Sequence, residues 1–295
     1  MGFGIALAGG GARGAAHVGV LLALEEAGMA PTAIAGTSAG GIVAGLYAAG
    51  LSAVRLQAVV HDLTQHGKRL IDPNYLGLIK AAGQFLLRGS ISLSGLLKGR
   101  RLEELLRTLT GGKSLHEARM RTVIPAVDLQ SGYTIAYVDR TANTQPVELV
   151  HWSDDALLCE AMRASAAFPV VFEPVKRADL CLIDGGVADN LPVNLLAAAG
   201  EPDILAVNIA EHYRMPVRDN VIEIASHTLS IMQERLLSYA ARGEKLMLRP
   251  RLPEQAGLLT FDQMDACMEA GYEATVQMLP SIRTLLAPSH AAAAR

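Results

Sequence analysis

The segment TAIAGTSAGGIVAGLYAAG, residues 32–50, predicts a short apolar strand that runs directly into a helix. Its junction, Gly36-Thr37-Ser38-Ala39-Gly40, is a GxSxG motif. A serine at such a junction sits in a sharp, strained turn, and the residues two before and two after it must be small so that strand and helix can approach. Gly36 and Gly40 meet this requirement, so Ser38 is a candidate nucleophile. Taken alone, the motif is equally consistent with a serine that caps a helix.

A second strand–turn–helix unit precedes this one. Residues 2–8 form an apolar run, residues 9–14 read GGGARG, and an apolar face at helical spacing follows over 15–27. The loop satisfies GxGxxG, the dinucleotide-binding fingerprint, but the second strand ends in AGTS without the acidic residue that would hold a ribose. The same geometry binds other anions, including a tetrahedral oxyanion, through backbone N–H groups at a helix N-terminus. A nucleotide-binding protein remains the alternative.

A carboxylate follows a third apolar strand. Leu180-Cys181-Leu182-Ile183 runs into Asp184-Gly185-Gly186, which puts Asp184 where sites form in open α/β sheets. A serine hydroxyl needs a base to take its proton. A free aspartate, with a pKa of about 4, is a weak base, so burial must raise its proton affinity. We predict that Asp184 is this base; a simple Asp-Gly turn is the competing interpretation.

A histidine could instead complete a Ser-His-Asp triad, as in α/β-hydrolases, where it follows the acid along the chain. His212, His227 and His290 follow the aspartate, but none lies in a glycine-rich or strand-end context. That fold also places several strands before its nucleophile, whereas one strand and one helix precede the serine's strand here. A Ser–Asp dyad is the simpler prediction, with a triad through His212 or His227 as its variant. His17 is expected to be a packing or supporting polar residue.

The remaining periodicity predicts further strands and helices in alternation. Such alternation indicates a mainly parallel sheet covered by helices, in a single domain over residues 1–287 with a short tail at 288–295. The expected strands are 122–129, 133–139, 180–183, 204–209 and 245–248, and the expected long helices are 154–164, 220–242 and 261–286.

Composition limits the classes of function. Apolar residues make up 51% and charged residues 19% of the chain, against a usual charged share of about a quarter, which excludes intrinsic disorder. With 26 basic and 29 acidic side chains the net charge is −3, which argues against a nucleic-acid partner. The three cysteines are far apart and form no CxxC, so neither a disulfide framework nor a metal site is indicated.

The sequence also bears on localisation. The first twelve residues carry no charged side chain, so a secretory signal is not expected. Residues 27–54 are uncharged and contain two GxxxG spacings, but six glycines and several polar residues interrupt them. A buried strand–turn–helix explains this composition better than a transmembrane helix. We expect a cytoplasmic protein, with any membrane contact peripheral and at the inner face.

Residues 67–101 differ in charge from the rest of the chain. They contain seven basic side chains and one acidic side chain, with apolar pairs between them. One interpretation is a lid that touches an anionic membrane surface. The other, which we weight slightly higher, is an ordinary cap that packs on its own domain, because glycine and proline interrupt the segment.

The motifs GGGARG, GTSAG and DGG, in this order and at these spacings, resemble those of the patatin-like phospholipases, particularly the compact bacterial members. The sequences ASAAFPVVFEP at 164–174 and DNLP at 189–192 agree with this resemblance, which is clear over roughly residues 3–209. It implies a three-layer α/β/α sandwich with a mainly parallel sheet. No clustered ligand set is present in the sequence, so we expect no metal, and we expect no cofactor. The resemblance also implies a lipid acyl hydrolase, although a shared fold does not identify the substrate.

The resemblance assigns roles residue by residue. Ser38 corresponds to the nucleophile and Asp184 to the proton acceptor of a dyad without histidine, while Gly10 and Gly11 correspond to the oxyanion-hole amides. Arg13 could face a substrate phosphate or hold the loop. A non-catalytic regulator with the same fold remains an alternative, and the sequence does not indicate the oligomeric state. The supporting motif residues are Gly9, Arg13, Gly14, Gly36, Gly40, Gly185 and Gly186.

Overall fold

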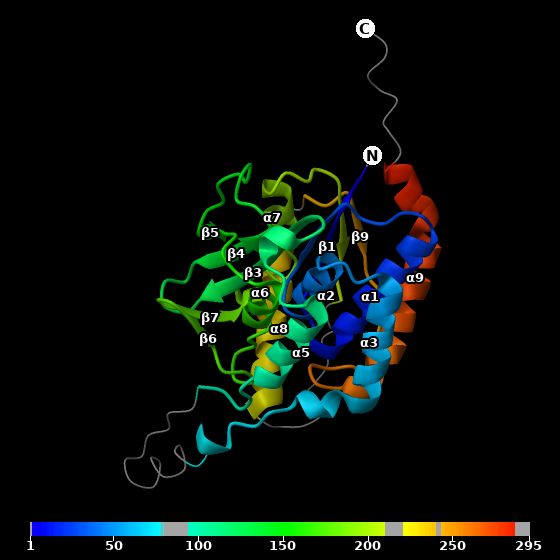
Figure 1. The fold of residues 1–295 in the computed structure, drawn as a ribbon. Helices are drawn as coiled ribbons and strands as arrows, with labels where there is room; N and C mark the ends of the chain where they lie inside the picture. The colour runs from blue at the N-terminus through cyan, green and yellow to red at the C-terminus, as the bar shows by residue number, and fades with distance from the viewer. Residues whose placement is uncertain (1, 78, 80–93, 210–220, 240–242, 287–295) are drawn as a thin grey trace.

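A mainly parallel sheet occupies the centre of the molecule (Figure 1). The computed structural model describes residues 2–77, 79, 94–209, 221–239 and 243–286. The strands of its main path are β1 (Gly4–Leu7), β2 (Ala33–Gly36), β3 (Arg121–Asp128), β4 (Thr134–Val138), β5 (Val150–Ser153), β8 (Ile204–Val207) and β9 (Leu246–Leu248). They follow the order β5-β4-β3-β2-β1-β8-β9, and all neighbours along it are parallel except β3 and β4.

Helices lie around this sheet (Figure 1). They are α1 (Ala15–Glu26), α2 (Ala39–Ala48), α3 (Ala53–His66), α5 (Arg100–Thr110), α6 (Leu158–Ser165), α7 (Val193–Ala198), α8 (Val221–Tyr239) and α9 (Met264–Leu286). Helix α1 packs against α3 and α9, α2 packs against β2, β3 and α6, and α7 packs against β1, β2 and β8. The predicted α/β fold with a mainly parallel sheet is confirmed.

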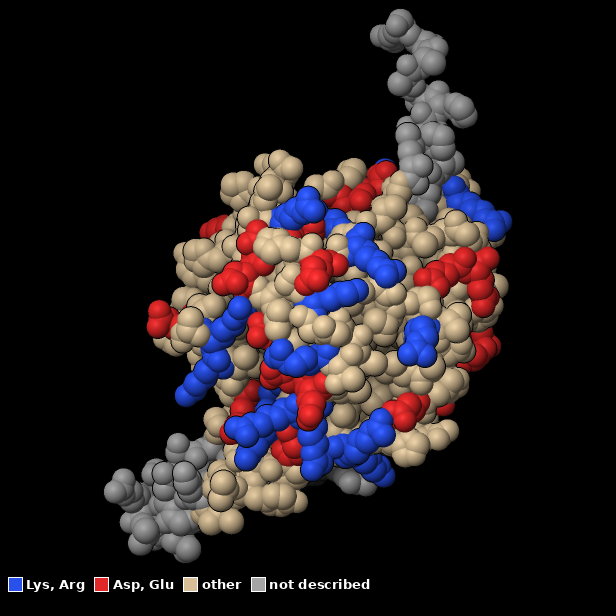
Figure 2. Space-filling view, viewed as in Figure 1, with Lys and Arg blue, Asp and Glu red and all other residues tan. Residues whose placement is uncertain are grey.

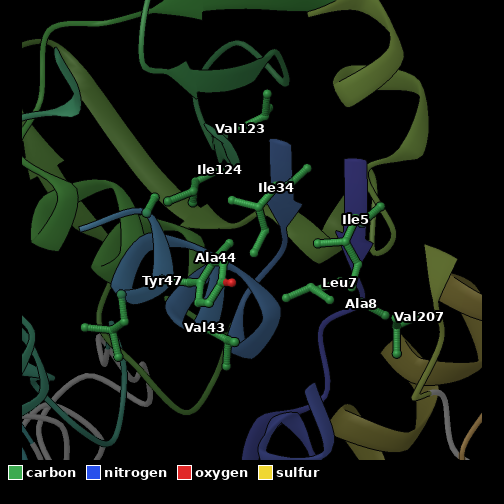
Figure 3. Packing of buried hydrophobic residues seen from close by; sticks show 14 of the residues in the cluster. Ile5, Leu7, Ala8, Ile34, Val43, Ala44, Tyr47, Val123, Ile124 and Val207 are labelled. Carbon is green, nitrogen blue, oxygen red and sulfur yellow. The ribbon is translucent and has the colours of Figure 1, made fainter. Parts of the chain in front are cut away.

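The core forms where α2 lies on the first three strands. Figure 3 shows Ile5 of β1, Ile34 of β2 and Ile124 of β3 beside Val43 and Tyr47 of α2. The three isoleucines are fully buried, and every residue of β1, β2 and β8 is buried, as expected for strands covered on both faces. This packing holds the start of α2 against the ends of β1 and β2.

Two strands share one edge of β3. Strand β2 pairs with β3 over Arg121–Val123, and the antiparallel strand β7 (Leu180–Asp184) pairs with it over Ala126–Asp128. Both lie on the same edge, because β4 pairs with the other edge over Val123–Val127. The carboxyl ends of β2 and β7 therefore point toward each other. The sequence predicts the strand before Asp184 but not its antiparallel direction.

Several elements differ from the prediction. Strands β5 and β6 (Val175–Arg177) and helices α3, α5 and α7 were not predicted. The helix expected over 154–164 begins at Leu158, because the Asp154 carboxylate accepts hydrogen bonds from the backbone N–H (3.1 Å) and hydroxyl (3.0 Å) of Thr141 and so belongs to the preceding loop. The tail at 288–295 lies outside the described residues.

The described ends of the 67–101 segment meet at the start of α5. The Asp72 carboxylate accepts hydrogen bonds from the backbone N–H groups of Gly99 (2.8 Å), Arg100 (2.8 Å) and Arg101 (3.2 Å), so it caps this helix from 28 residues away. Residues 78 and 80–93 lie outside the described residues. The lid and its contact with an anionic membrane therefore stay predictions.

The uncharged stretch at 27–54 folds as predicted, into the buried strand β2, the turn after it and the helix α2. Within the described ranges, no helix combines the length and the hydropathy that crossing a bilayer requires.

We expect Asp72→Ala to lower the free energy of unfolding by about 1–2 kcal/mol, because three N–H groups at the start of α5 lose their acceptor. Denaturant titration measures this change. Asp155→Ala is the matched control, since the Asp155 side chain is fully exposed. Equal stability of the two variants would contradict the capping role.

Candidate active site

Ser38 occupies a strained turn between β2 and α2. Its φ of 53° and ψ of −120° are rare for a residue with a side chain. A Cβ atom on Gly36 would overlap the carbonyl of Gly40, and one on Gly40 would overlap the carbonyl of Leu7. Both positions therefore require glycine, because a side chain there would prevent the close approach of strand and helix that the motif predicts. The turn leaves Ser38 only 8% exposed.

Hydrogen bonds from distant segments hold this turn in place. The backbone N–H of Ser38 donates to the hydroxyl of Ser165 (2.9 Å), at the end of α6, and the hydroxyl of Thr37 donates to the carbonyl of Asp189 (2.9 Å). Strained backbone persists only where its surroundings fix it in this way. Sequence analysis assigned no role to Ser165 or Thr37. The signal for Ser165 in the sequence is its place in the stretch 164–174, which agrees with the family resemblance.

Asp184 lies at the end of β7, where the two strand ends meet. It is 1% exposed, and its backbone N–H donates to the carbonyl of Ala167 (3.1 Å). One carboxylate oxygen, Oδ1, accepts from the N–H of Gly186 (2.8 Å), while Oδ2 is buried and has no hydrogen-bond partner among the described residues. Gly185 packs against the carbonyl of Pro125 in β3.

Burial raises the pKa of Asp184 from its ordinary 3.8 to about 7. The side-chain interaction with Ser38 and the hydrogen bond from Gly186 lower this pKa in turn, but desolvation has the larger effect. The prediction that burial increases the proton affinity of Asp184 is confirmed. The structure thus brings together the Ser38 hydroxyl and a carboxyl that titrates near neutrality.

The glycine loop lies against the serine. A Cβ atom on Gly9 would be 3.1 Å from that of Ser38, and the backbone N–H of Gly9 donates to the carbonyl of Asn190 (3.0 Å). Gly11 has a φ of 60°. No acceptor among the described residues takes a hydrogen bond from the N–H groups of Gly10 and Gly11. Within the described part of the chain, these two amides of the glycine loop therefore have no acceptor.

Two buried side chains, Arg13 and His17, hydrogen-bond to backbone carbonyls in and just before this loop. Arg13, which is 8% exposed, donates from Nε to the carbonyl of Gly10 (3.1 Å). His17 is fully buried, and its Nε2 lies 2.8 Å from the carbonyl of Ala8, just before the loop. Burial lowers the pKa of His17 to about 4, so the ring is neutral at neutral pH and donates through Nε2. Both residues hold the loop, and Gly14 packs against Ala39 at the start of α2.

His227, the one described histidine among those considered for a triad, is not found among the groups that act on Asp184. His227 lies half-buried in α8, and the groups that shift the pKa of Asp184 include no histidine in the described part of the chain. His212 and His290 lie outside the described residues. Among the residues that are described, no three metal-ligating side chains lie close enough to hold an ion.

An apolar cavity opens at the serine. Gly11, Gly14 and Ser38 are among the residues that line it. Every other described residue in its lining is alanine, valine, leucine, isoleucine, phenylalanine or methionine, and no charged side chain contributes. Figure 2 shows charged side chains spread over the face that carries α3 and α5, with uncharged surface between them. The reactive groups thus face an environment suited to hydrocarbon.

Comparison with known proteins adds independent information. Residues 5–197 match the family model described as patatin-like phospholipase. The uncharacterized NTE family protein Rv1063c of Mycobacterium tuberculosis is 31% identical over 229 residues, covering 77% of this chain and 54% of its own length. Lysophospholipase NTE1 of Eremothecium gossypii is 31% identical over 209 residues, covering 70% of this chain and 12% of its own.

Among solved structures, VipD from Legionella pneumophila matches with a TM-score of 0.50 at 17% identity, over 95% of this chain and 67% of that chain. At this identity the likeness concerns the fold alone. The chain spans about half the length of the first two curated relatives it matches, with 45% and 54% of their lengths covered.

We expect Asp184→Asn to stabilise the protein at alkaline pH. Burial raises the pKa of the Asp184 carboxyl in the folded wild type by about three units. This shift lowers the free energy of unfolding by about 4 kcal/mol near pH 8, and by about half of that or less near pH 5. Asparagine does not ionise, so the gain in unfolding free energy grows as pH rises. Thermal or urea unfolding at both pH values measures it.

The control is Asp179→Asn, which alters an exposed aspartate near the same strand. It should show no gain that grows with pH. A gain for Asp184→Asn that is the same at both pH values would contradict the raised pKa.

Proposed function

The chain belongs to the patatin-like phospholipase family, and we propose that it is a serine lipid acyl hydrolase that cleaves carboxylic esters through a dyad of Ser38 and Asp184. The observation that carries the proposal is a strained serine beside a buried carboxyl with a pKa of about 7. The apolar cavity at Ser38 supports a lipid substrate. So does the relative whose name is lysophospholipase NTE1.

In the first half of the reaction, Oδ2 of Asp184 accepts the proton of the Ser38 hydroxyl as the oxygen attacks the ester carbonyl carbon. The backbone N–H groups of Gly10 and Gly11 donate hydrogen bonds to the oxyanion that forms. Loss of one such donor typically costs about 3 kcal/mol of transition-state stabilisation. When the tetrahedral intermediate collapses, Asp184 returns the proton to the departing alcohol, and the acyl group stays on Ser38.

In the second half, Asp184 takes a proton from a water molecule, which attacks the acyl-enzyme. The same amides bind the second oxyanion, and Ser38 leaves with the proton that Asp184 held. The carboxylic acid is released and the dyad is restored. A base with a pKa near 7 suits both halves, because it is ionised at neutral pH and yet holds a proton well enough to pass it on.

Replacing either member of the dyad should abolish hydrolysis. We expect Ser38→Ala and Asp184→Asn each to lower kcat/KM for p-nitrophenyl butyrate and for a phospholipid by about a thousandfold or more, because nucleophile and base act as one unit. A fluorophosphonate probe should label wild type but not Ser38→Ala.

The matched controls are Ser281→Ala and Asp179→Asn, both at exposed positions. They should retain wild-type activity. Full activity in either dyad variant would refute the mechanism, and a wild type that neither hydrolyses an ester nor reacts with the probe would favour the non-catalytic alternative.

Activity should rise with pH as Asp184 ionises. Because the base form is required, kcat/KM should fall about tenfold per pH unit below pH 7 and level off above it. The Asp189 carboxyl, whose pKa burial raises to about 6, also titrates near the turn, whereas His17 with a pKa of about 4 stays neutral. A rate profile from about pH 5 to pH 8 tests this, and a flat profile would contradict Asp184 as the base.

A further inference from the structure

Two described stretches of the 67–101 segment pair with each other and form a stem. Pro73 and Leu97 form an antiparallel bridge, and the backbone N–H of Asn74 donates to the carbonyl of Leu96 (2.8 Å). The stem consists of residues 71–74 and 94–99. Figure 1 shows the chain (cyan) leaving the lower end of α3 and passing below α5.

Asn74 fixes the helical turn that follows the first stretch of the stem. It is buried, and its Nδ2 donates to Oε1 of Glu173 (2.7 Å), in the chain between α6 and β6. Its Oδ1 accepts a hydrogen bond from the backbone N–H of Gly77 (3.0 Å), at the end of the first helical turn after the stem. A buried amide thus joins this turn to the body of the domain.

The same turn holds large apolar side chains in water. Tyr75, Leu76 and Ile79 are 67%, 66% and 69% exposed, more than any other large apolar side chain that the structure describes. Apolar side chains scattered singly over a surface are ordinary, but a group of them marks a contact surface. A tyrosine suits a boundary between water and hydrocarbon, because its ring is apolar and its hydroxyl is polar.

Basic side chains gather at the base of the stem. Nη1 of Arg101 donates to the carbonyls of Arg69 (3.0 Å) and Ile71 (3.1 Å), so the start of α5 lies against the chain that follows α3. Figure 2 shows Lys and Arg side chains together at the lower end of this face, with some acidic side chains between them. The five basic residues at the base of the stem are Lys68, Arg69, Lys98, Arg100 and Arg101.

The positive charge of this region is local. The chain has a net charge of −3, so an anionic surface attracts this region while it repels the molecule as a whole. Asp72 is the one acidic residue among the described residues of the segment, and its carboxylate is taken up by the N–H groups at the start of α5. Outside the segment, Asp62 of α3 pairs with Arg69.

The apolar and basic groups lie close together and adjoin the apolar cavity. Four positions separate Asp72, at the start of α5, from Leu76, so their Cα atoms are at most about 14 Å apart. Leu70, Ile71 and Leu97, which line the cavity, are chain neighbours of the basic residues. A surface that combines exposed apolar and basic side chains therefore lies beside the cavity of the candidate nucleophile.

We propose that this docking surface, formed by Tyr75, Leu76, Ile79 and the five basic residues, binds an anionic lipid bilayer. The apolar side chains enter the boundary between head groups and acyl chains, and the basic side chains contact the phosphates. A protein partner would suit the apolar side chains alone, but the basic residues and the adjoining apolar cavity favour a bilayer. That docking supplies lipid to Ser38 rests on the proposed function, whereas the docking itself does not.

Vesicle flotation tests the docking surface. The full chain should bind vesicles of equal amounts of phosphatidylglycerol and phosphatidylcholine about tenfold or more tightly than vesicles of phosphatidylcholine alone, because several basic residues contribute roughly fivefold each. Added salt should weaken this binding, since it screens exposed charges. Pure lipid vesicles contain no protein, so the measurement isolates the proposed partner.

Two double variants separate the charged from the apolar contribution. Lys68→Glu with Arg100→Glu should weaken binding to the anionic vesicles about tenfold or more and leave binding to phosphatidylcholine unchanged. Tyr75→Ser with Leu76→Ser should weaken binding to both kinds of vesicle, by about tenfold or more, because apolar surface no longer leaves water. Urea unfolding checks that each variant is folded.

The matched control is Val54→Ser with Arg55→Glu. Val54 is 60% exposed and Arg55 is exposed, and both lie at the start of α3, whereas Lys68 follows the other end of that helix. This variant changes one apolar and one basic side chain on the surface and should bind vesicles as the wild type does. Equal binding by the control and by both docking variants would overturn the proposal, and so would a wild type that does not bind the anionic vesicles.

The outcome is separable from that of the proposed function. Ser38→Ala should bind the anionic vesicles as tightly as the wild type, because docking does not use the nucleophile. Hydrolysis of p-nitrophenyl butyrate without vesicle binding would refute the docking surface alone. Vesicle binding that depends on the docking surface, without ester hydrolysis, would refute the proposed function alone.

Discussion

The site depends on two strands that end against each other on one edge of β3. β2 and β7 run in opposite directions along this edge, and their carboxyl ends carry Ser38 and Asp184 into contact range. Pro125 lies in β3 between the two paired stretches, where no neighbouring strand requires the N–H that proline lacks. A hydroxyl and a carboxyl that are 146 positions apart in the sequence are thus placed by backbone pairing.

The same packing that stabilises the core gives Asp184 its chemistry. Removing the carboxyl from water raises its pKa, and the single N–H of Gly186 compensates only part of that effect. The raised pKa of Asp184 and the loss of stability expected at alkaline pH therefore have one cause, desolvation of an incompletely bonded carboxylate. The strained turn at Ser38 is also held by buried elements: the N–H of Ser38 donates to the hydroxyl of Ser165, and the N–H of Thr37 donates to the carbonyl of Leu7.

Helix α2 connects the candidate nucleophile to the apolar cavity. Its first turn follows Ser38 directly, and residues of the same helix line that cavity. Residues of α5 line it as well. Because the capping contact of Asp72 fixes the start of α5, this part of the lining also depends on residues of the basic 67–101 segment.

The motifs alone predicted the strand–turn–helix units, the glycines at positions 36 and 40, and the pair of residues expected to react. Those features are local: each follows from which backbone angles and close approaches neighbouring residues permit. The antiparallel direction of β7, the support of Ser38 by Ser165 and the apolar cavity at Ser38 could not be predicted. They depend on pairing, burial and packing between segments far apart in the chain. Only the folded structure determines which of these distant segments pack against each other and bury each other's surface.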